Sequence, residues 1–97
     1  MPDFVAVLAI YYLCSSEADR RALSVAEAQG CAAIYEQVKV PFRPKVDPPP
    51  TEARARADRN RSAYIAFKRW ETAHPAVVCP LKRQARMEPH KLLTNDR

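Results

Sequence analysis

Proline is the residue type that most constrains how this chain folds. The 97 residues include nine prolines but only one glycine. Proline fixes φ and lacks a backbone N–H, so it interrupts helices and central strands. With a single glycine, the chain also has few of the residues that tight hairpin turns require. We therefore expect a mainly α protein rather than a self-contained β domain.

The prolines are concentrated in one stretch. Five of them fall within residues 41–50, PFRPKVDPPP. Such a run favours polyproline II geometry at roughly 3 Å per residue, which gives a stiff segment of about 30 Å. The sequence therefore predicts two or three helices joined by a Pro-rich extended spacer, without a compact independent core.

This spacer divides the chain into four predicted segments. The N-terminal helical segment covers residues 1–40 and contains an apolar run followed by an amphipathic helix. The spacer covers residues 41–50 and a long basic and aromatic helix covers residues 51–75. The last segment, residues 76–97, is a basic C-terminal tail. Because a chain of this length buries only a modest fraction of its surface, we expect the isolated protein to be marginally stable.

The apolar run covers residues 4–13 and is about half as long as a membrane-spanning helix. No Lys or Arg precedes it, and Asp3 stands where a secretory signal would be positive. We expect a buried segment that does not span a membrane by itself. A pattern this short does not separate helix from strand. Helix is the preferred prediction because no second β-rich run pairs with it.

A helix start is predicted at Ser24. Ser24 and Glu27 form a capping box, in which each side chain accepts a hydrogen bond from the other residue's backbone N–H. Four residues then follow at spacings of three and four on one helix face: Ala28, Cys31, Tyr35 and Val38. Pro41 is predicted to end this helix.

The helix after the spacer is predicted to begin at a Thr51 cap and to stop at Pro75. Cations recur every seven residues along one stripe: Arg54, Arg61 and Lys68. We place the aromatic residues on a different side, where they form an apolar surface that docks onto protein. Nucleic-acid stacking platforms would instead need exposed rings within a positive groove. The predicted partner-binding residues are Tyr64, Phe67, Trp70, Ile34, Tyr35 and Phe42.

The cysteines and histidines form no recognisable catalytic or metal motif. Cys14, Cys31 and Cys79 contain no CxxC pair, which favours free thiols in a reducing compartment, with a Cys14–Cys31 bridge as the alternative. Cys79 with His74 or His90 lacks the paired spacings of a zinc site. One glycine does not build a phosphate-binding loop. We expect no enzyme, metal or cofactor.

The net charge of +5 favours acidic partners without choosing among them. In type, the chain resembles the small basic helical subunits of large assemblies. We expect a non-enzymatic accessory subunit of a large multi-protein assembly, with a mitochondrial respiratory-chain or ATP synthase complex favoured and another intracellular location as the alternative. The alternative function is a small nucleic-acid-binding protein, ribosomal or virion-associated. Its expected phosphate contacts are Arg54, Arg61 and Lys68.

Overall fold

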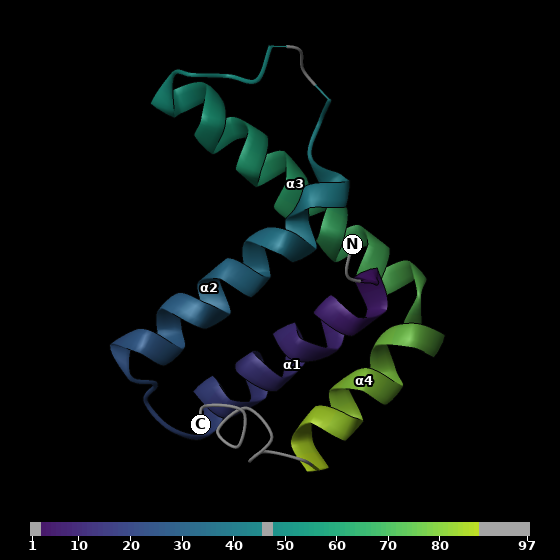
Figure 1. Cartoon of the computed structure of the whole chain (residues 1–97). Helices are drawn as coiled ribbons and strands as arrows, with labels where there is room; N and C mark the ends of the chain where they lie inside the picture. The colour runs from purple at the N-terminus through teal and green to yellow at the C-terminus, as the bar shows by residue number, and fades with distance from the viewer. Residues whose placement is uncertain (1–2, 46–47, 88–97) are drawn as a thin grey trace. The chain divides into compact units, whose positions relative to one another are not determined.

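The computed structural model describes residues 3–45 and 48–87. They form α1 (Phe4–Arg20), α2 (Val25–Lys39), the 3-10 helix η1 (Val40–Phe42), α3 (Ala53–Ala73) and α4 (Pro75–Met87), with no strand among them (Figure 1). The prediction of a mainly α protein is confirmed. The predicted count of two or three helices is wrong, because α4 forms within the segment expected to be a basic tail.

The helices belong to two compact units. One, the three-helix unit, contains α1, α2 and α4. The other, the α3 unit, runs from Lys39 to Pro75 and contains η1 and α3. The three-helix unit is therefore built from two separate stretches of the sequence.

The apolar run forms the first part of α1, so the preference for helix over strand is confirmed. Val7, Leu8 and Tyr12 are buried, and Leu8 is completely so. The helix has Asp3 as its N-cap without a side-chain cap hydrogen bond, and the Val7 N–H donates to the Asp3 carbonyl oxygen at 3.1 Å. Among the described residues, no helix is long and apolar enough to cross a membrane.

The turn between α1 and α2 is closed by side chains that the sequence pattern predicted in part. The Ser24 N–H donates to Glu27 Oε1 at 2.9 Å, and the Glu27 N–H donates to Ser24 Oγ at 3.1 Å, so the capping box is confirmed. Arg21 adds a forked pair of bonds to the same carboxylate, at 3.1 and 2.8 Å, and a third bond from Nε to Glu17 Oε2 at 2.8 Å. One guanidinium therefore joins the end of α1 to the first turn of α2.

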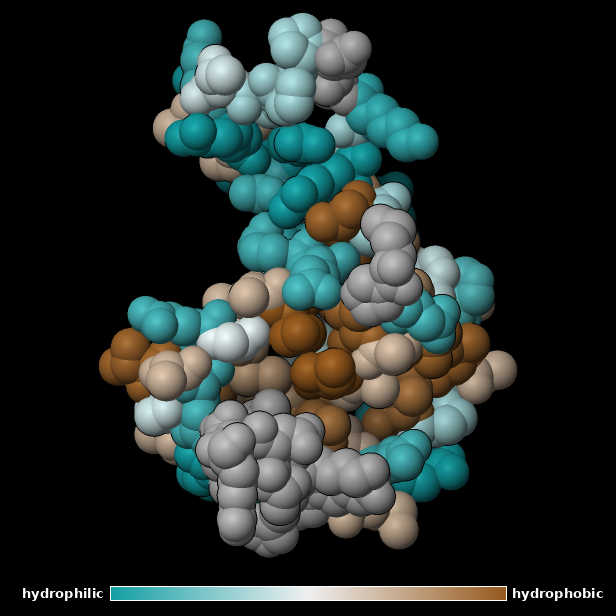
Figure 2. All heavy atoms as spheres, viewed as in Figure 1, coloured by the Kyte–Doolittle hydropathy of each residue, from teal (hydrophilic) through white to brown (hydrophobic). Residues whose placement is uncertain are grey.

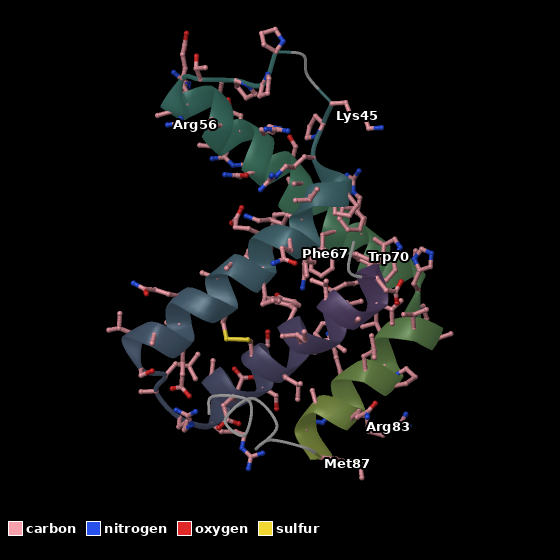
Figure 3. The ribbon with its side chains drawn as sticks, viewed as in Figure 1. Lys45, Arg56, Phe67, Trp70, Arg83 and Met87 are labelled. Atoms are coloured by element: carbon pink, nitrogen blue, oxygen red, sulfur yellow. A yellow bond between two sulfur atoms is a disulfide. The ribbon has the colours of Figure 1, made fainter. Side chains whose placement is uncertain are left out.

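Two contacts hold α2 against α1. A disulfide joins Cys14 to Cys31, with 5.8 Å between their Cα atoms (Figure 3). The rings of Tyr11 and Tyr35 are stacked, with centroids 5.2 Å apart. The structure contains the Cys14–Cys31 bridge, which was the alternative prediction. The favoured prediction of free thiols at these two positions is wrong.

α4 completes the three-helix unit on the other side of α1 (Figure 1). Val78 and Ala85 are buried at a spacing of two helical turns. Lys82, between them, places its ammonium group 5.4 Å from the centroid of the Tyr12 ring. α1 is thus the central helix of this unit.

The segment between η1 and α3 does not form the predicted spacer. Phe42 in η1 packs against α3, with its ring centroid 5.6 Å from that of Phe67 and 6.2 Å from that of Trp70. Phe67 lies 14 residues into α3, about 21 Å from Ala53 along the helix at 1.5 Å of rise per residue. Phe42 therefore packs near the far end of α3 rather than beside its start, which a linear pattern of prolines did not reveal. Val46 and Asp47 lie outside the described residues.

The ends of α3 differ from one another. Its N-cap is Glu52, which makes no side-chain cap hydrogen bond, so the prediction of a Thr51 cap is wrong. At the other end His74 is the C-cap, and its Nδ1 lies 2.8 Å from the Trp70 carbonyl oxygen. Pro75 follows as the first residue of α4, a position that needs no N–H. The helix therefore stops where the sequence predicted and a new helix begins at once.

Candidate interaction surface on α3

The side of α3 that packs within the chain is narrow. Its buried residues are Ala63, Phe67 and Glu71, which recur at a spacing of four. Ala63 and Phe67 have no exposed surface, and Trp70 is half-buried, with its ring stacked on that of His74 at 4.6 Å. The second half of α3 therefore has an inner side that the aromatic residues occupy.

Large side chains also lie on the outside of this half. Tyr64 is 46% exposed and Ile65 is 44% exposed. Neither side chain takes part in the internal packing, although both residues directly follow the buried Ala63. Tyr64 had been predicted to share one apolar surface with Phe67 and Trp70; instead it is the exposed member of the three.

Exposed cations accompany these two residues. At 3.6 residues per turn, residues four or seven apart lie on the same side of a helix, and those three apart lie close to it. Ile65 therefore lies in line with Arg61 and beside Lys68, and Tyr64 is adjacent to both. We call the following residues the outer face of α3: Arg54, Arg61, Tyr64, Ile65 and Lys68.

The charge of this face is reduced at two places. Lys68 Nζ lies 2.7 Å from Glu71 Oε1, so that cation is already paired. Asp58 is exposed and stands four residues after Arg54 and three before Arg61. The outer face therefore carries separated charges, with its apolar residues Tyr64 and Ile65 between Arg61 and Lys68, and it does not form a continuous positive strip.

The first half of α3 makes little contact with the rest of its unit. No residue of the range 53–62 is buried, and only Ala55 and Arg59 are partly covered. Hydrophilic atoms cover this end of the helix in the view of Figure 2. Arg56 projects from this half in Figure 3. Four arginines against one aspartate give it a positive field.

The predicted partner-binding residues thus divide into three groups. Tyr64 is exposed on the outer face, Phe42 and Phe67 pack on each other, and Trp70 is half-buried beside them. Ile34 and Tyr35 lie in the three-helix unit, where both are half-buried and Tyr35 stacks on Tyr11. These six residues therefore belong to two different units, and those of the α3 unit differ in exposure. Ile65 was not singled out from the sequence, although its place in line with Arg61 was a usable signal.

An ion cluster lies at the α1–α2 turn of the three-helix unit. The forked hydrogen bonds from Arg21, with the bond from the Ser24 N–H, lower the pKa of Glu27 from 4.5 to about 2. The hydrogen bonds to Glu27 and to Glu17 raise the pKa of the Arg21 guanidinium. The Glu17 side chain is 6% exposed and its Oε1 is buried with no hydrogen-bond partner in the described part of the chain. This cluster fastens the α1–α2 turn.

Metal-ligating side chains are dispersed within the described ranges. No group of three or more His, Cys, Asp or Glu residues in residues 3–45 and 48–87 is placed to hold a metal ion. Cys79 is exposed on α4 as a thiol outside the disulfide. His90, the other histidine considered with it, lies outside the described residues.

No protein-family model, no curated protein and no solved structure matches this chain.

Proposed function

We propose that this protein is a non-enzymatic accessory subunit that docks onto a larger protein assembly through α3. One observation carries the proposal. On the outer face of α3, Tyr64 and Ile65 are exposed at 46% and 44%, next to cations, while the opposite side of the second half of the helix is buried. Neighbouring large apolar side chains that internal packing leaves exposed are typical of a contact with another protein.

The internal braces of the chain agree with such a role. A disulfide and a forked ion cluster hold α1 to α2, and tilted aromatic rings hold η1 to α3. A surface held rigid before binding loses less conformational entropy when it docks. Within the α3 unit, the contact of Phe42 with Phe67 therefore restrains the second half of α3.

The disulfide bears on the proposed location. Disulfides persist in oxidising compartments and are rare where thioredoxin and glutathione keep thiols reduced. We keep a mitochondrial respiratory-chain or ATP synthase complex as the proposed assembly. The Cys14–Cys31 bridge adds the expectation that the protein resides in an oxidising compartment. A reducing interior fits this pair of cysteines less well.

The test is the size of the species that contains the protein in its native source. We expect a tagged chain to migrate with a complex far larger than 11.0 kDa and to form cross-links to neighbouring proteins from α3. A Tyr64→Ala, Ile65→Ala double variant should be lost from the complex while keeping its helical circular dichroism. Migration of the native protein as a free monomer would contradict the proposal.

One observation favours a second function, nucleic-acid binding. The first half of α3 carries the exposed Arg54, Arg56 and Arg61 and the partly covered Arg59. Phosphate contacts from several cations would give affinity that falls steeply with salt, with each contact adding roughly one unit to the slope. Binding of a single-stranded oligonucleotide, measured from about 0.05 to 0.2 M salt, tests this function directly.

A further inference from the structure

The outer face of α3 has a regular spacing that restricts what binds to it. Arg54 and Arg61 are seven residues apart, which places their Cα atoms about 10.5 Å apart along one side of the helix. Ile65 follows Arg61 by one turn and Tyr64 stands beside it, and both are exposed. The face therefore presents two cations one heptad apart and then an apolar patch.

The phosphate backbone of a nucleic acid fits this face poorly. Asp58 is exposed between the two arginines, where a continuous anionic backbone would meet its carboxylate. Lys68, at the next heptad position, is already paired with Glu71 at 2.7 Å. A phosphate placed opposite the Asp58 carboxylate would be repelled. The face therefore favours separated anions over a continuous line of phosphates.

A helix with its own heptad pattern fits the same face well. Carboxylates seven residues apart lie on one side of a helix at the spacing of Arg54 and Arg61. An apolar residue on that side, beyond the carboxylates, would cover Tyr64 and Ile65. Helices that pack side by side in this way bury an apolar seam and flank it with opposite charges.

We propose that the outer face of α3 binds an acidic amphipathic helix of a protein partner. Arg54 and Arg61 contact two carboxylates that lie one heptad apart, and Tyr64 and Ile65 pack against an apolar residue of the same helix. This inference rests on the proposed docking function and specifies the chemistry of the partner.

The probe is a fluorescent helical peptide of about 20 residues, with glutamates one heptad apart and leucines on the same side, and its binding to the full chain is followed by anisotropy. A peptide of the same composition with scrambled order is the control. We expect the patterned peptide to bind at least about tenfold more tightly than the scrambled one. Equal binding of the two peptides would overturn the inference.

Variants of the chain separate pattern from net charge. Arg54→Gln with Arg61→Gln should weaken binding of the patterned peptide about tenfold, and Tyr64→Ala with Ile65→Ala should do the same with less effect on the salt dependence. The matched control is Arg56→Gln with Arg83→Gln, which removes the same charge from two other exposed positions. If this control pair weakens binding as much as the first pair, only net charge is being measured and the inference fails.

The competing ligand is a single-stranded oligonucleotide of about 20 nucleotides, tested under the same conditions. Tighter binding of the oligonucleotide than of the patterned peptide, with loss in the Arg54→Gln, Arg61→Gln variant, would replace the acidic helix with nucleic acid. The docking function is judged separately by the size of the native complex. A large native complex with no preference for the patterned peptide would refute this inference and leave the docking function standing.

Discussion

The rings of Phe42 and Phe67 lie 5.6 Å apart, and this contact joins the start of the proline-rich segment to the second half of α3. Phe67 is completely buried, whereas Phe42 is half-buried and also approaches Trp70. The packing of the α3 unit therefore depends on one residue of the three-residue helix η1.

Replacing Phe42 by Ala tests this dependence. The substitution removes the ring contacts with Phe67 and Trp70, and we expect it to lower the free energy of unfolding by about 2 kcal/mol, below the range for fully buried aromatics because Phe42 is half-buried. Trp70 is the one tryptophan in the sequence, so its fluorescence during denaturant titration reports this unit. Tyr64→Ala, at an exposed position, is the control and should change stability by no more than about 0.5 kcal/mol.

The disulfide should be the main brace between α1 and α2. Cys14 and Cys31 are separated by 17 residues, and closing a loop of that size constrains the unfolded chain by about 3 kcal/mol. We expect Cys14→Ser with Cys31→Ser to lower the free energy of unfolding by about that amount, measured by circular dichroism in urea. Cys79→Ser removes a thiol outside the bridge and should leave stability nearly unchanged. Equal stability of the oxidised and reduced wild-type protein would show that the bridge does not brace the fold.

Acid should weaken the α1–α2 turn through Glu27. Its pKa is lowered from 4.5 to about 2 in the folded protein, so the unfolded chain binds the proton first as pH falls. The stabilisation is complete above about pH 4.5 and is lost as the pH falls from there toward 2. Thermal melts across this window should fall less steeply for Glu27→Gln than for the wild-type protein. Parallel curves for the two proteins would show that Glu27 contributes nothing to the acid response.

Pro80 interrupts α4 in its interior and leaves the Ala76 carbonyl without its usual helical donor. The residue is exposed, so no internal packing is lost by shortening it. We expect Pro80→Ala to stabilise the chain by up to about 3 kcal/mol and to raise its helical signal. A lower melting temperature would mean that the helix requires the bend that proline imposes.

Local signals in the sequence predicted the features that depend on neighbouring residues. Ser24 with Glu27 predicted the capping box, and Pro75 predicted the end of α3, because each acts through bonds within a few residues. The sequence also contains a signal for α4, with Pro75 at the first helical position and Val78 and Ala85 on one face. The prediction of a basic tail for this segment did not use that signal.

Contacts between distant residues were beyond what the sequence pattern could determine. Phe42 and Phe67 lie 25 residues apart in the sequence, and no local rule places a single-turn helix on so distant a ring. The disulfide was left open for the same reason, since spacing alone does not say whether two helices are antiparallel neighbours. Tyr64 is exposed because the buried side of α3 is narrow, and the width of that side does not follow from the position of Tyr64 in the helix.

The two stretches of the three-helix unit are made at different times during synthesis. α1 and α2 are complete within the first 39 residues, and these residues include both cysteines of the disulfide and all members of the Arg21 ion cluster. Their contacts span fewer residues than the contact between Tyr12 and Lys82 of α4, so less loop-closure entropy opposes them. The α1–α2 hairpin can therefore form before α4 adds to it, and its disulfide needs no residue of α4 to close.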